Sequence, residues 1–256
     1  MQHQLGLRSV AVRAAYLVYG GGSYGLFLAT ILYAIGFVGN FWGALGLTGP
    51  AFRSMDVGSS EPVTHALVID SALLLVFALQ HSGMARPAFK RRLQRYVPEA
   101  LERSTYVLLA SLCLDLLFWQ WRPLGTTGLW TLPEGPFALA SVGVSLLGWL
   151  LVFSATFMID HFELFGLRQT WSAFRSRACP EQPFATPGLY RAVRHPIYLG
   201  FIIAFWATPV MTVGHALFAT LTTFYILSAI QWEEHDLVAR FGDQYREYRR
   251  RVRMLI

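Results

Sequence analysis

The sequence has few charged residues, two cysteines and a single lysine. Asp, Glu, Lys and Arg make up 14% of its 256 residues, whereas soluble domains carry about 25%. Cys113 lies in an apolar segment and Cys179 in a polar one, so the pair indicates neither a disulfide framework nor a CxxC metal site. With hydrophobic residues at 54%, the composition favours a membrane protein over a soluble globular domain.

The net charge of +6 comes almost entirely from arginine, because 20 of the 21 basic residues are Arg. These arginines lie between apolar segments rather than in one run. That placement is typical of membrane orientation and not of a nucleic-acid interface, so we expect no nucleic-acid partner. The first apolar segment has no A-x-A-type cleavage site, which favours an uncleaved span over a signal peptide.

The apolar segments predict the fold class. A bilayer core of about 30 Å needs about 20 residues of helix. Five segments approach this length, and a sixth is shorter: 15–38, 63–82, 104–121, 137–159 and 213–232, then 197–210. We expect one all-α integral membrane domain over 1–256, with about six transmembrane helices of which the last two form a hairpin. Within it, 1–160 is the four-span part and 182–256 the hairpin and tail.

The distribution of basic residues predicts the orientation. If the N-terminus lies in the cytoplasm, 19 of the 21 Lys and Arg residues fall in the cytoplasmic (inner) segments. The outer loops then hold only Arg53 and Arg122. The inner segments are 1–14, 83–103, 160–196 and 233–256. Basic residues resist translocation, so both termini are expected in the cytoplasm. A five-span version, with 197–210 re-entrant, is the less favoured alternative.

The C-terminal residues have a helical pattern. Aromatic and apolar residues recur on one face and arginines on the other: Phe241, Tyr245, Tyr248 and Val252 against Arg246, Arg250 and Arg253. This pattern predicts an interfacial helix that contacts membrane lipid. The alternative interpretation is that these C-terminal residues form a basic tail exposed to water.

Polar residues occur at four of the expected inner helix ends. They are Gln80-His81-Ser82, Asp160-His161-Phe162-Glu163 leading to Arg168-Gln169, Arg194-His195, and Glu233-Glu234-His235. Each group alone is more often structural, but four groups at one membrane face predict a common site. Outer-end His65 and His215 are expected to be interfacial, and Asp70 and Asp115 to join helices.

The chemistry of the inner groups suits S-adenosylmethionine. This molecule offers an adenine for aromatic rings, a ribose diol for a carboxylate, a zwitterionic end and a sulfonium cation. Segment 182–200 and Glu233-Glu234 supply matching groups, although spacing alone does not distinguish this cofactor from another. The G-x-G-x-x-G letters at 20–25 lie inside an apolar span without βαβ context, so they indicate helix packing rather than a Rossmann motif.

The last 70 or so residues resemble a known signature. Gly188-Leu189-Tyr190, Arg194-His195-Pro196-Ile197-Tyr198-Leu199-Gly200, Glu233-Glu234 and Phe241-Gly242-x-x-Tyr245-x-x-Tyr248 are similar to the isoprenylcysteine carboxyl methyltransferase and phospholipid methyltransferase superfamily. The resemblance implies an S-adenosylmethionine site. Its residues are Leu189, Tyr190, His195, Tyr198, Gly200, Glu233 and Glu234.

The N-terminal two thirds resemble the nurim-like group, through Gln80-His81-Ser82 and the run 161–169. Within it the chain is most similar to bacterial methanethiol S-methyltransferases. The resemblance implies methylation of a small thiol, methanethiol to dimethyl sulfide, at the cytoplasmic side of a bacterial inner membrane. We expect His161 or His81 to accept the thiol proton and Arg168 to stabilise the anion. The expected substrate contacts are Phe162, Glu163, Phe165 and Gln169.

Two other functions fit parts of the pattern. His81, His161, His195 and His235 suit a metal or haem membrane oxidoreductase, because neutral imidazoles are good ligands. No HxxxH-type cluster repeats, however, and no metal is expected. The chain also fits a non-enzymatic nurim-like membrane protein. The acceptor and the oligomeric state do not follow from the sequence.

Overall fold

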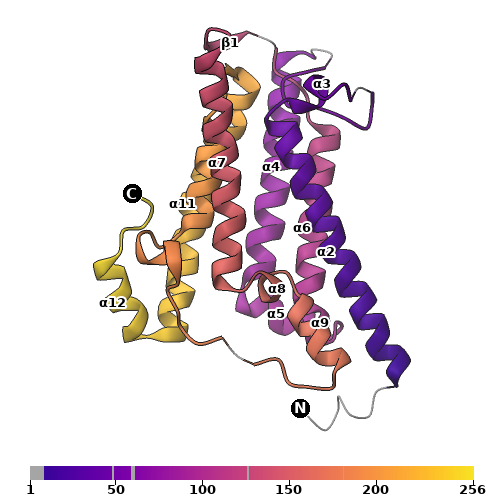
Figure 1. The fold of residues 1–256 in the computed structure, drawn as a ribbon. Coiled ribbons are helices and arrows are strands. Elements are labelled where there is room, and N and C mark those ends of the chain that lie inside the picture. Colours follow the sequence, from indigo (N-terminus) through magenta and orange to yellow (C-terminus); the bar gives the residue numbers. More distant parts are fainter. Residues whose placement is uncertain (1–8, 48, 59–60, 126, 181) are drawn as a thin grey trace. The chain divides into compact units, whose positions relative to one another are not determined.

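The computed structural model describes residues 9–47, 49–58, 61–125, 127–180 and 182–256, and most of them are helical (Figure 1). The long helices are α2 (Val10–Val38), α4 (Val63–Ala85), α6 (Glu99–Gln120), α7 (Pro136–Ile159) and α11 (Val213–Phe241). The shorter ones are α3 (Phe41–Ala44), α5 (Pro87–Leu93), α8 (His161–Leu164), α9 (Leu167–Phe174), α10 (Pro196–Trp206), α12 (Asp243–Arg251) and the 3-10 helix η1 (Gly188–Arg191).

Four helices, α2, α4, α7 and α11, are long and apolar enough to cross a membrane. The other two expected spans are also helices, but α6 carries Glu99, Glu102 and Arg103 within its 22 residues, and α10 has only 11 residues. The expectation of a mostly helical membrane protein is therefore supported by four spans, and the helices lie where the apolar segments predict them.

Two short strands depart from the all-α prediction. β1 (Gly128–Thr131) pairs antiparallel with β2 (Val210–Thr212), with Gly128 opposite Thr212 and Thr131 opposite Val210. Trp130 Nε1 also donates to the Thr208 carbonyl at 3.2 Å. The two loops satisfy each other's backbone groups in this way, which apolar periodicity does not predict.

The contacts divide the chain into two units. Unit 1 comprises Met1–Leu32, Val76–Asp115 and Asp160–Pro183, and unit 2 comprises Tyr33–Leu75, Leu116–Ile159 and Phe184–Ile256. Helices α2, α4 and α6 contribute residues to both. The C-terminal part expected to hold the cofactor lies within unit 2 from Phe184 onward, together with two segments from the N-terminal part.

In unit 1, glycine permits a close helix contact. A Cβ on Gly20 would lie 2.5 Å from Thr170 Oγ1, so α2 and α9 touch at this point. A Cβ added to Gly21, Gly22 or Gly25 would meet nothing within 4 Å. The helix-packing interpretation of the glycine-rich motif is confirmed at Gly20.

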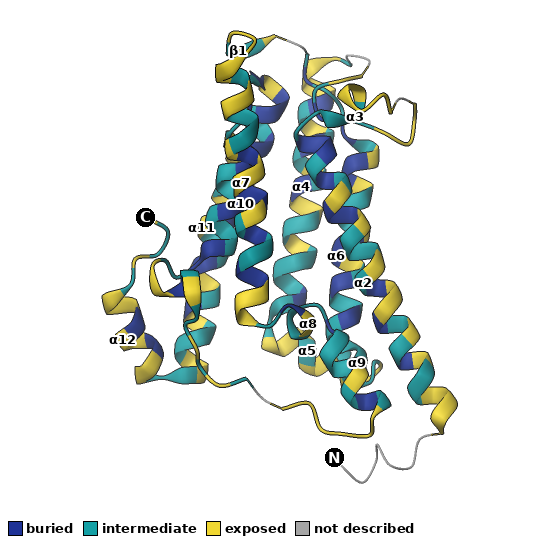
Figure 2. Cartoon of the chain, viewed as in Figure 1, coloured by how far each residue is buried: buried dark blue, intermediate teal, exposed yellow. Residues whose placement is uncertain are grey.

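In unit 2, α10 packs chiefly against α7. The buried residues of α7 follow a helical repeat of three to four positions: Ser145, Gly148, Trp149, Val152, Ala155 and Thr156. Buried residues are dark blue along the helices in Figure 2. A Cβ on Gly148 would lie 2.6 Å from Ala204 N, and one on Gly200 would lie 2.7 Å from Gly148 O. The two backbones are therefore in contact, and this contact sets the position of α10.

The outer-end residues differ partly from expectation. Asp70 accepts a hydrogen bond from Arg122 N at 2.9 Å, and Asp115 accepts one from Thr30 Oγ1 at 3.0 Å, so both acids join separate segments as expected. His215, expected at the interface, is only 1% exposed. The interfacial prediction is wrong for His215 because its ring is enclosed by protein partners.

The predicted C-terminal helix is present as α12. Its arginines are exposed, but Tyr245 and Tyr248 are buried against Phe184, with ring centroids 5.9 and 5.5 Å away. The aromatic face that the sequence assigned to lipid therefore packs on protein.

We expect Gly148→Ala to lower the thermal unfolding midpoint in detergent. The added methyl meets backbone atoms of α10 that cannot move independently, and overpacking costs about 1–3 kcal/mol. Gly143→Ala, on the same helix with nothing within 4 Å of its Cβ position, is the matched control. Equal midpoints for the two variants would contradict the backbone contact.

Candidate functional site

Glu234 is the centre of a buried ionic cluster in unit 2. It lies on α11 and is 4% exposed. Its Oε1 accepts hydrogen bonds from Arg194 Nε at 2.7 Å and His195 Nε2 at 3.1 Å, and Arg249 Nε lies 3.2 Å from Oε2. A carboxylate removed from water needs such partners to offset its lost hydration. Glu234 thus ties α11 to the start of α10 and to α12.

Glu233 has a different environment from its neighbour. Its side chain is 44% exposed, and Oε2 lies 3.9 Å from His195 Nδ1. Of the two acids that the sequence assigned to the cofactor, Glu233 has a carboxylate accessible to a ligand, whereas that of Glu234 is occupied by protein partners.

The segment before α10 is held by α7 and α12. Gly188 has a φ of +52°, a backbone conformation that residues with a side chain rarely adopt, and it lies against the Met158 side chain. The Tyr190 carbonyl accepts a hydrogen bond from Tyr248 Oη at 2.6 Å. Burial, with a smaller effect of the nearby Glu233 carboxylate, raises the pKa of Tyr190, and burial raises that of Tyr248 to about 12. Both phenols therefore stay neutral and can donate hydrogen bonds.

The chain end closes against the same segment. Arg194 N donates to the Arg253 carbonyl at 2.9 Å, and His195 N donates to the Met254 carbonyl at 3.2 Å. Val193 and Arg253 form a parallel bridge. Sequence reasoning missed this contact because an extended pair far apart in the chain leaves no periodic signal.

An aromatic group lies beside the ionic cluster. Phe184 contacts the rings of Phe241, Tyr245 and Tyr248 at centroid distances of 5.3, 5.9 and 5.5 Å. Among the side chains that the structure describes, Tyr245 Oη is one of the buried polar atoms without a hydrogen-bond partner. A buried hydroxyl of this kind is available to a bound polar ligand.

The remaining predicted cofactor residues lie in the same unit. Tyr198 is half-buried, with its ring centroid 5.7 Å from that of His195, and Leu189 N lies 3.4 Å from Met158 Sδ. Gly200 is buried against α7. Its predicted contact with the cofactor stays a prediction.

In unit 1, His161 is enclosed by aromatic rings. It is 3% exposed, and its ring centroid lies 4.8 Å from Phe165 and 5.6 Å from Phe162 and Tyr24. Tyr24 Oη is 2.8 Å from His161 Nε2, and Phe27 stacks on Phe165 at 3.9 Å. Sequence reasoning identified His161, Phe162 and Phe165 but missed Tyr24 and Phe27, which lie on a helix far away along the chain.

Asp160 fixes the segment that carries His161. Its φ of +156° is rare for a residue with a side chain. Its carboxylate accepts from Glu163 N at 3.0 Å and Gln182 Nε2 at 3.0 Å, and it forms an ion pair with Arg168. The partner of Arg168 in this structure is therefore Asp160, so the predicted role of Arg168 in stabilising an anion stays a prediction.

The other predicted unit 1 residues also have protein partners. Gln169 Nε2 donates to the Glu163 carbonyl at 3.1 Å. His81 has its ring nitrogens 2.9 and 3.0 Å from Tyr106 Oη. Arg103 lies 5.2 Å from the Tyr106 ring centroid and donates to the Leu164 carbonyl at 2.6 Å. It thus links the His81 end of α4 to the segment after His161.

The four polar helix ends fall two to each unit. In unit 2 the ends at 194–195 and 233–234 meet directly, whereas His235 is exposed. In unit 1 the ends at 80–82 and 160–169 are joined through Arg103 and Tyr106. Within the described ranges, no group of three or more His, Cys, Asp and Glu side chains is arranged to hold a metal ion.

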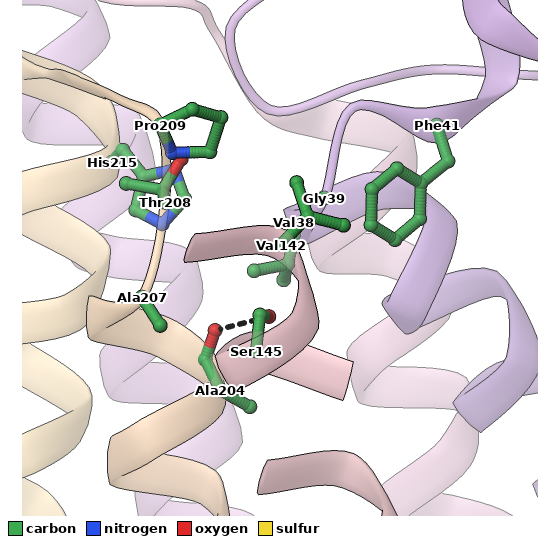
Figure 3. A pocket seen from close by; sticks show the side chains of 10 residues that line it. All are labelled: Val38, Gly39, Phe41, Val142, Ser145, Ala204, Ala207, Thr208, Pro209 and His215. Atoms are coloured by element: carbon green, nitrogen blue, oxygen red, sulfur yellow. Dashed lines mark hydrogen bonds between the residues drawn. The ribbon is translucent and has the colours of Figure 1, made fainter. Parts of the chain in front are cut away.

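A second polar cluster, at the other end of unit 2, was not predicted. Asp56 accepts from Asn40 Nδ2 at 2.7 Å and from Thr212 Oγ1, and lies 3.4 Å from His215 Nδ1. Burial opposes ionisation of Asp56, but bonds from His215, Thr212 and Asn40 outweigh it and lower the pKa. Beside His215 is a small pocket with a cavity volume of about 10 Å³, lined by residues such as Ser145, Thr208 and Pro209 (Figure 3).

The chain matches the NnrU protein family over residues 71–236, a range that contains every predicted site residue. The chain belongs to this family. It is 52% identical to methanethiol S-methyltransferase 2 of Bradyrhizobium diazoefficiens, over 95% of this chain and 90% of that protein.

Two other relatives extend the comparison. The methanethiol S-methyltransferase of Mycobacterium tuberculosis is 51% identical, over 94% of this chain and 95% of that protein. Nurim of Xenopus laevis is 34% identical over 62% of this chain and 58% of its own length. No solved structure matches this chain. The predicted relation to nurim-like proteins and methanethiol S-methyltransferases is confirmed.

We expect Glu234→Ala to destabilise the protein far more than Glu233→Ala. Removing Glu234 leaves Arg194 and His195 buried without their carboxylate, and breaking a buried ion pair costs about 3–5 kcal/mol. The Glu233 side chain is 44% exposed, so water can take the place of its carboxylate after the substitution. Thermal unfolding in detergent measures both variants, and similar midpoints would contradict the central role of Glu234.

Proposed function

We propose that this protein transfers the methyl group of S-adenosylmethionine to methanethiol and releases dimethyl sulfide. The observation that carries the proposal is the 52% identity, over 95% of the chain, to a protein named methanethiol S-methyltransferase. Two chemically distinct groups of residues, the ionic and aromatic cluster of unit 2 and the aromatic cluster of unit 1, suit the two reactants.

The donor set of unit 2 fits S-adenosylmethionine. Glu233 offers an exposed carboxylate for the ribose diol, and Tyr245 offers a buried hydroxyl that lacks a partner among the described side chains. The half-buried ring of Tyr198 and the Phe184 group suit adenine. Leu189, Tyr190, His195 and Gly200 complete the proposed site.

When bound, S-adenosylmethionine supplies a methyl group on a sulfonium cation. The proposed role of Glu233 is to bind the ribose diol, and Glu234 acts as a positioning residue by fixing Arg194 and His195. The chain end, bonded to the backbone of residues 194 and 195, holds the same segment in place. Positioning is the main requirement of an in-line displacement.

The unit 1 residues suit a small apolar thiol. Phe162 and Phe165 offer aromatic surface, which interacts favourably with sulfur, while Glu163 and Gln169 border them. His161 is the proposed proton acceptor and His81 the second candidate, with Arg168 as a source of positive charge. A thiol with a pKa above neutrality reacts faster once it is deprotonated.

For the topology we propose six spans, an active site facing the cytoplasm and a location in the bacterial inner membrane. The lopsided distribution of Lys and Arg supports this orientation. Helices α6 and α10 are the two spans added to the four that meet the length and composition of a crossing.

Purified protein in detergent should convert methanethiol and S-adenosylmethionine to dimethyl sulfide, measured by gas chromatography. A panel of other thiols, an isoprenoid cysteine and an amine, assayed with labelled donor, identifies the acceptor class. Transfer to the amine or the isoprenoid cysteine but not to methanethiol would contradict the proposal.

The proposed S-adenosylmethionine site can be tested with a variant of Glu233 and a matched control variant. Glu233→Gln keeps the size of the side chain but removes the charge, and it should weaken S-adenosylmethionine binding about tenfold or more, measured by calorimetry. Asp243→Asn, an exposed acid on α12, should bind like the unaltered protein. Full activity in the Glu233→Ala/Glu234→Ala double variant would contradict this placement of the donor.

The orientation can be tested with the protein's own thiol. Cys179 is exposed and is expected in the cytoplasm, so a membrane-impermeant maleimide should label it only after the inner membrane is opened. Labelling is run above neutral pH, where more of the thiol is in its reactive thiolate form. A Val57→Cys variant lacking Cys113 and Cys179 should be labelled in intact cells, because Val57 lies in an outer loop and is 69% exposed. The reverse pattern would overturn the topology.

A further inference from the structure

Tyr24 covers one ring nitrogen of His161. Its hydroxyl lies 2.8 Å from His161 Nε2. His161 is 3% exposed, whereas Tyr24 is half-buried. The Tyr24 hydroxyl is therefore a polar group in direct contact with Nε2, on a residue that is less buried than the histidine.

We propose that Tyr24 is the residue that contacts the thiol and that it relays the thiol proton to His161. This inference rests on the proposed thiol methylation and identifies its base as a pair of residues rather than a single histidine. Tyr24 lies outside the range matched by the family and was not expected from the sequence.

The relay conserves atoms and charge. The thiol S–H bond breaks and its proton passes to Tyr24 Oη, while the phenolic proton of Tyr24 passes to His161 Nε2. Tyr24 stays neutral, His161 becomes an imidazolium and the sulfur keeps the S–H electron pair as a thiolate. The thiolate then takes the methyl of the sulfonium donor, whose C–S electron pair stays on the departing sulfur, and His161 releases its proton to water.

The surroundings keep His161 ready to accept a proton. Burial lowers its pKa, and the nearby Asp160 carboxylate raises it by a smaller amount. Asp160 is itself paired with Arg168 on α9. From α6, Arg103 donates to the Leu164 carbonyl. The imidazole is therefore neutral at pH 7, and a neutral ring has a nitrogen lone pair for the Tyr24 proton.

The aromatic rings beside the pair suit the sulfur. Phe165, Phe27 and Phe162 surround Tyr24, with centroids 6.2 to 6.5 Å from its ring. Aromatic rings attract divalent sulfur. The hydroxyl of Tyr24 is thus a polar group placed among rings that suit a methyl thiol.

The test removes the hydroxyl and varies the acidity of the thiol. Tyr24→Phe is assayed with ethanethiol and with trifluoroethanethiol, which has a similar size but is more acidic and needs less help from a base. We expect kcat/KM to fall on the order of 100-fold with ethanethiol and much less with trifluoroethanethiol, with unchanged binding of S-adenosylmethionine. For ethanethiol the loss should shrink as pH rises.

Tyr19→Phe is the matched control. Tyr19 lies on the same helix in unit 1, and its hydroxyl is 3.0 Å from Thr105 Oγ1 rather than from a histidine. It should react normally with both thiols. His161→Gln, which keeps a polar partner for Tyr24 but removes the proton acceptor, should reproduce the selective loss and serves if Tyr24→Phe does not fold.

A second readout is independent of turnover. Nitrogen NMR of the unaltered protein should show His161 with its proton on Nδ1 at neutral pH, since Nε2 accepts from Tyr24. The fall of kcat/KM at acidic pH should occur below the ordinary histidine pKa of 6.5, because a protonated His161 cannot accept the Tyr24 proton.

The outcomes separate the relay from the proposed function. Equal losses with both thiols at all pH values, an unaffected Tyr24→Phe variant, or a proton on Nε2 would overturn the relay while thiol methylation stands. An unaltered protein that methylates neither these thiols nor methanethiol would overturn the proposed function and the relay with it.

Discussion

In a chain this apolar, a charged group that leaves water has to be paired within the protein, and that constraint organises both units. Glu234 is the clearest case. Its carboxylate receives Arg194, His195 and Arg249, so three separate pieces of chain converge on one acid. Loss of that acid would leave the largely buried Arg194 guanidinium without its carboxylate, which is why the segment before α10, the end of α11 and α12 adopt one arrangement. Asp160 has the corresponding place in unit 1, with Arg168 and Gln182 as partners.

The same pairing decides which groups remain for chemistry. The carboxylates of Glu234 and Asp160 are bound by protein partners, whereas Glu233 is half exposed and the Tyr24 hydroxyl lies 2.8 Å from the Nε2 of a buried histidine. Adjacent residues thus have different tasks. In Glu233-Glu234 one acid holds the structure and its neighbour faces outward, and in Asp160-His161 the acid fixes the backbone that presents the imidazole. A strained φ at Asp160 is tolerated because its side chain has several partners.

Much of this was predictable from local pattern. The apolar segments located α2, α4, α6, α7 and α11, because a helix in lipid needs a long uninterrupted apolar run. The shorter apolar segment 197–210 predicted a helix, and α10 begins at Pro196. The polar helix ends identified His161, His195 and Glu234 as candidates. The β1–β2 pair, the buried state of His215 and the docking of α12 on Phe184 were not predicted, since each depends on a partner distant in sequence.

The sequence by itself determined that the chain is a helical membrane protein and which family it resembles, because hydrophobic length and motif spacing are properties of consecutive residues. Only the tertiary structure decided that Glu233 and Glu234 differ, that the chain end closes on residues 193–195, and that Tyr24 lies against His161. Those facts depend on which buried polar atoms find each other when helices pack. Such pairing depends on three-dimensional proximity, so it cannot be predicted from the order of residues along the chain.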